Sequence, residues 1–285
     1  MRKLHVLLSF VSLIFLTIVA SAQVPRSSHV IVVVEENHSF SSVIGSPSMP
    51  YLNSLAGRYA VATQYYANTH PSIGNYFQMT TGRIITNNDG FSSTVSADNI
   101  VRHLLTGGKT WKSYAEALPS VGYTGGDTGA YVRHHNPFSF FSDVVNSNVQ
   151  KLNLVPATHF LSDITNHALP DFSLLVPDNA HNGHNGTLAQ ADSWLQSHLP
   201  PLLNSAAFKQ DGILIIVFDE SAESDTAHGG GHVAAVVIGP HVKPGFKSTA
   251  LYQHQNVLRT ALQAIGVSSY PGAAASASPM KDMFF

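Results

Sequence analysis

Acidic side chains stand directly after three apolar runs of this sequence. The runs and the acids that follow them are Val30–Val34 with Glu36, Phe172–Val176 with Asp178, and Ile213–Phe218 with Asp219 and Glu220. Short runs rich in β-branched residues predict buried parallel strands, and ligands of open α/β sheets bind beyond the carboxyl ends of such strands. Carboxylates held close together repel one another unless protons or cations intervene. The pattern therefore predicts a metal site, although each motif alone also fits a turn or a helix cap.

A serine in the segment Thr69–Tyr76 has the setting of a nucleophile. Ser72 lies between a strand-like stretch, Val61–Tyr66, and a predicted helix over Asn75–Thr81. At a helix N-terminus, backbone N–H groups and the helix dipole favour an anion, and a hydroxyl beside a divalent cation can ionise and attack phosphorus. The same position also fits a simple N-cap. The absence of a G-x-S-x-G motif disfavours a Ser-His-Asp hydrolase.

Histidines are the other abundant source of ligands, with sixteen in the chain and no cysteine. Asp178 and His184 share one loop, and His228 and His232 flank a triglycine that lets the backbone approach a ligand closely. We weigh His232 above His228 because it opens a fourth apolar run that ends at Ile238. A site without thiolates must use imidazole and oxygen ligands, which suit Zn²⁺, Mn²⁺, Fe or Ca²⁺.

Two adjacent histidines, His134 and His135, follow Arg133 in an aromatic stretch. This group of a cation and two imidazoles could hold phosphate oxygens or a leaving group. It equally fits a loop whose histidines are satisfied by the surrounding protein.

Strands alternate with helical patterns, which predicts a layered α/β sheet. We expect a fourth strand over Val233–Ile238 and a region of loops and short helices over about 83–170, covering one edge of the sheet. A short surface loop is expected over Ala273–Ser278, and His254 is expected to cap a helix or support the site rather than bind a ligand. The helical patterns cover Met49–Tyr59, Asn75–Thr81, Asn99–Leu105, Thr187–Leu199 and Gln253–Ile265.

The composition and the first residues bound the class of protein. The chain has 285 residues, 44% hydrophobic and 11% charged, and a net charge of −2, so it can bury a core and lacks the basic surface of a nucleic-acid binder. Residues 1–22 predict a cleaved signal peptide, with a basic start, an apolar run and Ala20-Ser21-Ala22 before Gln23. We expect residues 23–285 to form a single catalytic domain that is exported to the periplasm or the medium. No second apolar run is long enough for stable membrane insertion.

Taken in order, these segments resemble the phosphoesterase family of the alkaline-phosphatase superfamily, which holds metal-dependent acid phosphatases and non-specific phospholipases C. The matching segments are Val32–Phe40, Asn68–Tyr76, Trp111–Glu116, His135–Phe138, Pro170–His184, Ala191–Leu195 and Phe218–Glu220. The resemblance implies a three-layer α/β sandwich with a mostly parallel central sheet. Gly74 stands where related sequences often have Pro. The pair Asp219-Glu220 replaces the Asp-His pair of the wider superfamily, and this family shares that replacement.

The resemblance also implies roles for individual residues. Ser72 matches the nucleophile, Asn75 the phosphate-binding Asn, and His135, with His134 beside it, a histidine that contacts phosphate or the leaving group. One cation would take Glu36, Asn37, Ser72, Asp219 and Glu220. A second cation, where present, would take Asp178, His184 and His232.

The sequence thus predicts an exported hydrolase of small phosphate monoesters that uses one or two divalent cations (Zn, Ca, Mg, Mn or Fe) and a phosphoserine intermediate. Asn37 would bind both cation and substrate. A phospholipase C or other phosphodiesterase on the same fold is the nearest alternative. A secreted metal-binding protein without catalysis is a more distant one, and the sequence leaves the oligomeric state open.

Overall fold

A strand whose residues are almost all apolar is apolar on both faces and must be covered on both. β1 (Val30–Glu35) and β6 (Ile213–Phe218) are of this kind, because every residue of each is buried. They pair in parallel along their whole length, from Val30 beside Ile213 to Glu35 beside Phe218, at the centre of an eight-stranded sheet. The structure is a computed structural model that describes residues 23–285.

The sheet has the strand order β4-β3-β5-β1-β6-β7-β2-β8 and is mostly parallel. Only β7 runs antiparallel to its neighbours, β6 and β2. The remaining strands are β2 (Ala60–Ala62), β3 (Trp111–Ala115), β4 (Leu154–Pro156), β5 (Phe172–Val176), β7 (Ala235–Ile238) and β8 (Lys247–Ser248). The helices are α1 (Phe40–Val43), α2 (Pro50–Arg58), α3 (Ser72–Thr81), α4 (Ile100–Thr106), α5 (Ser142–Val145), α6 (Thr158–Thr165), α7 (Leu188–Asn204), α8 (Ala206–Asp211) and α9 (His254–Ala264).

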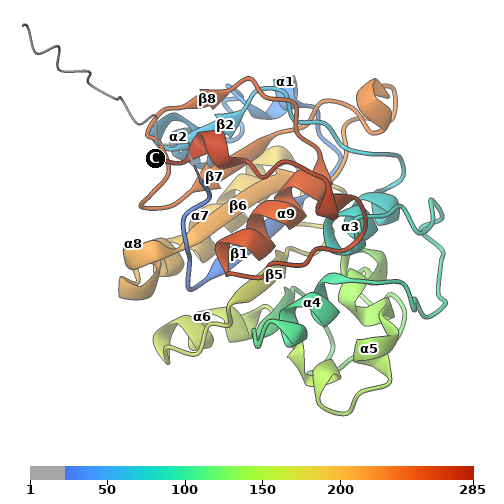
Figure 1. Cartoon of the computed structure of the whole chain (residues 1–285). Coiled ribbons are helices and arrows are strands. Elements are labelled where there is room, and N and C mark those ends of the chain that lie inside the picture. Colours follow the sequence, from blue (N-terminus) through green and yellow to red (C-terminus); the bar gives the residue numbers. More distant parts are fainter. Residues whose placement is uncertain (1–22) are drawn as a thin grey trace, which may run out of the picture.

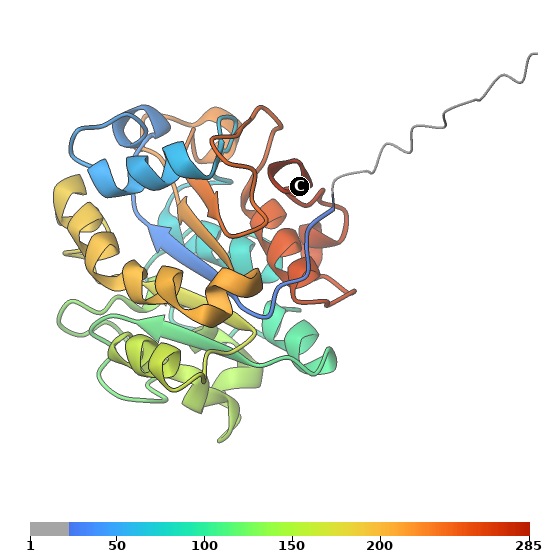
Figure 2. The ribbon, with the colours of Figure 1, turned by 90° about the vertical axis from the view of Figure 1, so that its left-hand side faces the viewer.

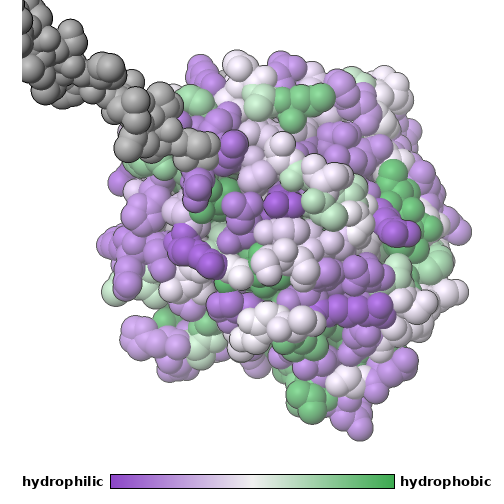
Figure 3. Space-filling model, viewed as in Figure 1, coloured by the Kyte–Doolittle hydropathy of each residue, from purple (hydrophilic) through white to green (hydrophobic). Residues whose placement is uncertain are grey.

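Helices cover both faces of the sheet and make three layers (Figures 1 and 2). α2, α6, α7 and α8 pack against one another on one face, whereas α3 and α9 pack together on the other. The face shown in Figure 3 is mostly hydrophilic, with scattered hydrophobic patches. The predicted three-layer α/β architecture is confirmed, and it directs the carboxyl ends of β1, β5 and β6 to one edge, which we call the carboxyl edge.

The apolar runs and helical patterns located most of the elements that form the sheet. β5 and β6 have the predicted bounds, and β1 extends one residue further, to Glu35. α7 begins after a capping box in which Thr187 and Gln190 bond reciprocally, but it continues past Leu199 to Asn204, with Pro200 and Pro201 inside it.

The expectation of loops and short helices over 83–170 is wrong in part. This region supplies two strands of the sheet, β3 and β4, together with the eight-residue helix α6. The sequence pattern does not predict β3, because Lys112 and Ser113 interrupt its apolar residues. In the structure the Lys112 ammonium donates to Asp163. The predicted surface loop over Ala273–Ser278 begins with a short 3-10 turn, Gly272–Ala275.

The predicted signal peptide, residues 1–22, lies outside the described residues. Within residues 23–285 no helix is both long and apolar enough to cross a bilayer.

Candidate active site

The end of β1 and the end of β6 meet at the carboxyl edge, where they bring together acids that are far apart in sequence. The backbone N–H of Asp219 donates to the carbonyl of Glu35 (2.9 Å), which extends the ladder by one more bond. Beyond it, the backbone N–H of Asn37 donates to Asp219 Oδ1 (3.1 Å). Glu36, Asp219 and Glu220 are all buried. Three acids therefore share one small volume, as the sequence predicts.

Ser72 reaches these acids from α3, in the helical layer that also contains α9. It is the first residue of α3, as predicted, and its side chain is buried. Its Oγ lies 3.1 Å from Glu36 Oε2 and 3.1 Å from Glu220 Oε1, so its single hydrogen can be donated to either carboxylate. The hydroxyl bonds to these two carboxylates and makes no capping bond to the backbone of its own helix. This geometry favours the nucleophile over the simple N-cap.

Burial in this group disfavours negative charge. Burial and the neighbouring Asp219 raise the pKa of Glu36 well above its usual range. Burial raises the pKa of Asp219 to about 6, and burial together with Asp219 raises the pKa of Glu220 to about 9. Carboxyl groups in this condition either keep protons or share a cation.

Several buried polar atoms at the carboxyl edge lack a hydrogen-bond partner. They are both carboxylate oxygens of Glu35, Asn37 Oδ1, Asp219 Oδ2 and His135 Nε2. Asp219 Oδ2 belongs to one of the three acids and Asn37 follows Glu36, and buried acceptors of this kind are costly unless something binds them. The set of Glu36, Asn37, Ser72, Asp219 and Glu220 offers only oxygen ligands, which suit hard cations such as Mg²⁺, Ca²⁺ or Mn²⁺. The residues present therefore fit the divalent cation that the fold family implies.

Two side chains on either side of Ser72 support the acids and were not singled out from the sequence. The Tyr76 hydroxyl donates to Glu36 Oε1 (2.5 Å), and His70 Nδ1 lies 2.8 Å from Glu220 Oε2. His70 Nε2 lies 3.0 Å from the carbonyl of Asp225 and must donate to it. A further proton is then shared between His70 and Glu220. Both residues stand in the segment that resembles the family. Their closeness to Ser72 in the sequence was the feature from which a role in the site could have been predicted.

His254 acts on the site through the backbone, in agreement with the supporting role expected for it. It is fully buried, its Nε2 donates to the carbonyl of Asp219 (2.6 Å), and its Nδ1 accepts from the Tyr65 hydroxyl (2.9 Å). Burial lowers the pKa of His254 to about 4. A neutral imidazole with both nitrogens bonded fixes the position of Asp219.

The predicted substrate histidines lie beside Glu36. His135 is buried, stacks on Tyr76 with ring centroids 5.1 Å apart, and places Nε2 3.2 Å from Glu36 Oε1 without a hydrogen bond between them. Burial, with His134 and His184 nearby, lowers the pKa of His135 well below its usual range. His134 is half-buried with its ring centroid 4.4 Å from that of His135, and His184 lies 6.1 Å from His135 in the same measure. Of the three imidazoles, His135 is the one in contact with an acid of the site, and the other two lie beside it.

Asn75 has a role that differs from the one implied by resemblance. Its Oδ1 accepts the backbone N–H groups of Asn68 (2.9 Å) and Thr69 (3.2 Å), and its Nδ2 donates to the carbonyl of Thr69 (2.8 Å). The side chain is fully buried. These bonds hold the segment that leads to Ser72 against the first turn of α3, whereas a phosphate contact by Asn75 stays a prediction.

The structure does not bring Asp178, His184 and His232 together as a second ligand set. His232 stacks on Phe40 (ring centroids 4.4 Å apart), and its Nε2 bonds to the carbonyl of Thr63 (3.0 Å). It precedes β7 instead of opening it, because that strand begins at Ala235. His184 is exposed and bonds to its neighbour Asn185.

Asp178 is found instead with two residues that the second ligand set did not include. Glu116, Asp178 and His181 each offer one ligand atom within 4.8 Å of the others, and among the described residues 23–285 they form the one group of three carboxylates or imidazoles that meets this criterion. His181 Nδ1 lies 3.1 Å from Glu116 and 3.0 Å from Asp178. Glu116 directly follows β3, the strand that the sequence did not reveal.

The triglycine before His232 allows a close contact between two backbones. A Cβ at Gly229 would lie 2.0 Å from the carbonyl oxygen of Asn68, and one at Gly230 would lie 2.3 Å from that of Thr69. Any side chain here would displace the segment that Asn75 holds.

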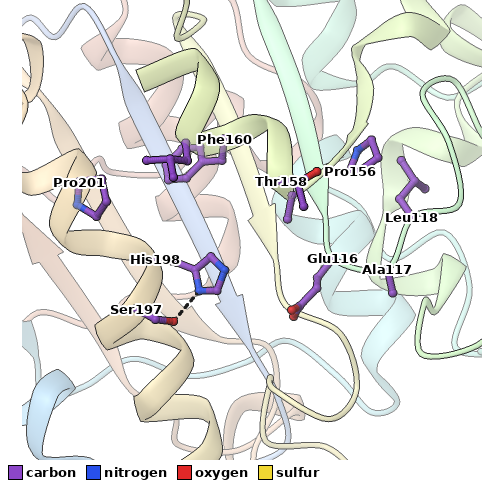
Figure 4. A pocket seen from close by; sticks show the side chains of 11 residues that line it. Glu116, Ala117, Leu118, Pro156, Thr158, Phe160, Ser197, His198 and Pro201 are labelled. Carbon is purple, nitrogen blue, oxygen red and sulfur yellow. Dashed lines mark hydrogen bonds between the residues drawn. The ribbon is translucent and has the colours of Figure 1, made fainter. Parts of the chain in front are cut away.

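A cavity of about 580 Å³ lies on the opposite helical layer from Ser72, between α6, α7 and the end of β3. Figure 4 shows Glu116 on one side of it and Ser197 and His198 of α7 on the other, with Phe160 and Thr158 from α6. Of the carboxyl-edge residues described above, only Glu116 also lines this cavity.

Comparison with known proteins decides the family. The model of the phosphoesterase family matches residues 46–268, most of the chain. The chain belongs to the phosphoesterase family. It is thus a hydrolase of phosphoric ester bonds, with relatives that carry phosphatase names.

Two such relatives illustrate the similarity of this phosphoesterase to curated proteins. It is 34% identical to a phosphatidylinositol-3-phosphatase of Mycobacterium tuberculosis over 93% of its own length and 85% of the relative's. It is 30% identical to a probable acid phosphatase of Kluyveromyces lactis, over 78% of its own length and 54% of the yeast protein. The chain therefore spans about half of the fungal relative.

Solved structures of the alkaline-phosphatase superfamily share the fold of this chain. A superfamily member from Vibrio parahaemolyticus matches 92% of this phosphoesterase and 73% of its own chain, with a TM-score of 0.58 at 16% identity. The likeness at such low identity concerns the fold alone, and it confirms the predicted fold class.

Proposed function

We propose that this phosphoesterase is a metal-dependent phosphatase that cleaves phosphate monoesters through a phosphoserine formed on Ser72. The observation that carries the proposal is the position of Ser72 Oγ, 3.1 Å from both Glu36 and Glu220 at the first turn of α3. A hydroxyl so placed has a proton acceptor on either side and a helix N-terminus behind it, where an anion is favoured.

The first displacement uses groups that the structure brings together. The hydrogen of Ser72 passes to Glu36 or Glu220 while Oγ forms a bond to phosphorus. The bond between phosphorus and the leaving oxygen breaks, and its electron pair stays on that oxygen. Tyr76 and His70 hold the two acceptors through hydrogen bonds of 2.5 and 2.8 Å, so the carboxylates keep their position as their charge changes.

Glu36, Asn37, Ser72, Asp219 and Glu220 would hold the cation in this proposal. When bound there, a divalent cation lowers the pKa of the serine hydroxyl and offsets the charge of the phosphoryl oxygens. The unpartnered Asn37 Oδ1 and Asp219 Oδ2 support this ligand set.

The second displacement returns the enzyme to its starting state. The oxygen of water bonds to phosphorus from the face that the leaving group vacated, and the bond between phosphorus and Ser72 Oγ breaks. Oγ takes back the proton that Glu36 or Glu220 received in the first displacement. One hydrogen of the water passes to solvent and the other leaves with the phosphate. Two in-line displacements give retention at phosphorus. Burial lowers the pKa of His135, whose Nε2 lies 3.2 Å from Glu36 without a hydrogen bond and is free to contact the phosphate or the leaving group. Donation of a proton to the leaving group by His135 requires that the bound phosphate first raise this pKa.

Metal analysis coupled to hydrolysis of a phosphate-ester panel tests the proposal. The purified protein should hydrolyse p-nitrophenyl phosphate, lose this activity after treatment with EDTA, and regain it with one of Mg²⁺, Ca²⁺, Mn²⁺, Zn²⁺ or Fe²⁺. Full activity after thorough chelation would refute metal dependence.

Phosphate monoesters are the substrate class we propose, since the relatives named above are phosphatases. The Mycobacterium tuberculosis relative is named for a phosphoinositide monoester, so a monoester on a lipid headgroup belongs in the panel. Phosphocholine esters belong there too, because faster cleavage of a diester would establish the phospholipase C alternative.

Export is the remaining part of the proposal. Residues 1–22 have the features of a signal peptide, and cleavage before Gln23 would release the chain that the structure describes. Expression of the full chain in a bacterium, followed by N-terminal sequencing of the exported fraction, should identify Gln23 as the first residue. Retention of Met1 in an exported or membrane-bound product would contradict cleavage.

A further inference from the structure

An acidic side chain from a neighbouring loop lies against the nucleophile helix. Asp89 Oδ1 accepts the backbone N–H of Ile73 at 3.0 Å, and Ile73 directly follows Ser72 in the first turn of α3. The N–H groups at this helix start are those that an incoming phosphate oxygen would use. The protein's own carboxylate thus occupies one of these anion-binding positions beside Ser72.

The local packing explains why Asp89 reaches this position. Residues 84–89 lie directly over the first turn of α3, because Gly74 has no side chain to exclude them. A Cβ at Gly74 would lie 2.5 Å from Asn87 Oδ1 and 3.3 Å from Ile84 Cγ2.

The charge of Asp89 also affects Glu220, one of the acids beside Ser72. Burial and Asp219 contribute most to the raised pKa of Glu220, and Asp89 adds to it. Asp89 also lines a cavity of about 170 Å³ together with Asp127, Arg133 and His134. The Arg133 guanidinium is bonded to the Ser139 hydroxyl and to the carbonyls of Ser92 and Ser139. None of these bonds is made to Asp89, so the Arg133 guanidinium does not pair with the carboxyl group that lies against α3.

We propose that Asp89 determines which charge state of the substrate phosphate this phosphoesterase prefers. A phosphoryl group with two negative charges is repelled by the Asp89 carboxylate about twice as strongly as one with a single charge. The residue therefore disfavours monoester dianions relative to monoanions, whether protonated monoesters or diesters. This inference rests on the proposed function, since it assumes that phosphate binds at the start of α3.

A purely structural role for Asp89 makes a different prediction, and the variant Asp89→Asn separates the two. Asparagine keeps an oxygen that can accept the Ile73 N–H but removes the charge. If Asp89 only caps the helix, Asp89→Asn leaves substrate preference unchanged and Asp89→Ala lowers stability. If its charge selects the substrate, Asp89→Asn is sufficient to change the preference, although it keeps the bond to Ile73.

The test compares two substrates of different charge at pH 7.5 with the metal-loaded enzyme. p-Nitrophenyl phosphate carries two charges at this pH and methyl p-nitrophenyl phosphate carries one. We expect Asp89→Asn to raise the ratio of kcat/KM for the dianion to kcat/KM for the monoanion about tenfold. Asp127→Asn is the matched control, because Asp127 lines the same cavity but bonds to the backbone of Arg133 and not to α3, and it should change the ratio less than twofold.

Binding of inorganic phosphate gives a readout that does not need turnover. Isothermal titration should show phosphate binding about tenfold more tightly to Asp89→Asn than to the wild type or to Asp127→Asn. An unchanged substrate ratio together with unchanged phosphate affinity would overturn the inference while the proposed function stands. If the wild type cleaves neither ester, the proposed function fails, and phosphate affinity alone decides the role of Asp89.

Discussion

At the scale of single residues, the site is a set of acids whose charges need a partner. Ser72 has a carboxylate on each side, and Asn37 Oδ1 and Asp219 Oδ2 are buried without hydrogen bonds. Removal of the serine hydroxyl should therefore stop the chemistry and leave most of the cation's ligands in place.

We expect Ser72→Ala to lower kcat on p-nitrophenyl phosphate by at least about 10³-fold, because the nucleophile of the first displacement is lost. Metal content, measured by atomic emission, should stay close to that of the wild type, since three carboxylates and one amide oxygen remain. Ser42→Ala is a suitable control, because its exposed hydroxyl bonds only to the backbone of Ser39. Near-full turnover by a metal-replete Ser72→Ala protein would exclude Ser72 as the nucleophile.

His254 gives a prediction for acid stability. Its pKa is lowered to about 4 by burial, whereas a histidine in the unfolded chain titrates near 6.5, so the unfolded state binds more protons between these values. Stability must then fall as the pH drops from about 6.5 to 4, by up to about 3 kcal/mol from this residue. Urea unfolding at pH 7 and pH 4.5 should show a smaller loss for His254→Gln than for the wild type. Equal losses in the two proteins would contradict the neutral buried imidazole.

The residues that the sequence predicts best are those that follow strands directly. Glu36, Asp219 and Glu220 were identifiable because an apolar run ends just before them and like charges at such a point need a cation. His70, Tyr76 and Asp89 were harder to identify, because their roles depend on which loops pack against the first turn of α3. No periodic pattern encodes a contact of that kind.

At the scale of elements, the segment before α3 is held by a side chain on one side and by glycines on the other. Asn75 makes three hydrogen bonds to Asn68 and Thr69, and Gly229 and Gly230 allow a second backbone to lie directly against them. The position of Ser72 thus depends on contacts made several residues away from it.

Substitution of Asn75 tests this dependence. Asn75→Ala leaves buried backbone groups of Asn68 and Thr69 unpaired and should lower the free energy of unfolding by about 2–4 kcal/mol. Asn75→Asp keeps the acceptor oxygen and should lose less. The readout is urea unfolding beside steady-state kinetics. A large rise in KM for phosphate esters without loss of stability would show that Asn75 binds substrate instead.

The apolar runs predicted the central strands of the sheet but not the strands β3 and β4 on one side of it. β1, β5 and β6 are continuous apolar runs, and such runs have few alternatives to a buried strand. β3 carries Lys112 and β4 has three residues, so neither has a pattern that separates it from a loop. Because β3 was missed, Glu116 could not be placed at the carboxyl edge beside Asp178 and His181.

At the scale of the whole molecule, the two halves of the site come from distant parts of the chain and meet through mutually repelling acids. A cation that binds only the folded state stabilises that state by mass action. The free energy of folding and the catalytic activity therefore depend on the same ligand.

We expect EDTA to lower the Tm of the purified protein by several degrees, and an excess of the cognate cation to restore both Tm and activity in parallel. Differential scanning fluorimetry with a series of cations measures the first, and hydrolysis of p-nitrophenyl phosphate measures the second. Asp219→Asn removes one of the charges and should weaken the response of Tm to the cation. A Tm that is indifferent to chelation and to added cations would argue against a metal bound by these acids.

The position of β1 in the strand order has a consequence for how the chain folds. Val30 pairs with Phe172 on one side and with Ile213 on the other, so both neighbours of this early strand are synthesised long after it. Contacts over such a sequence separation form slowly. A chain leaving the ribosome therefore has no complete central sheet until residue 218 has emerged. If the chain is exported as we propose, the incomplete sheet during that interval would favour passage through a secretion channel before folding.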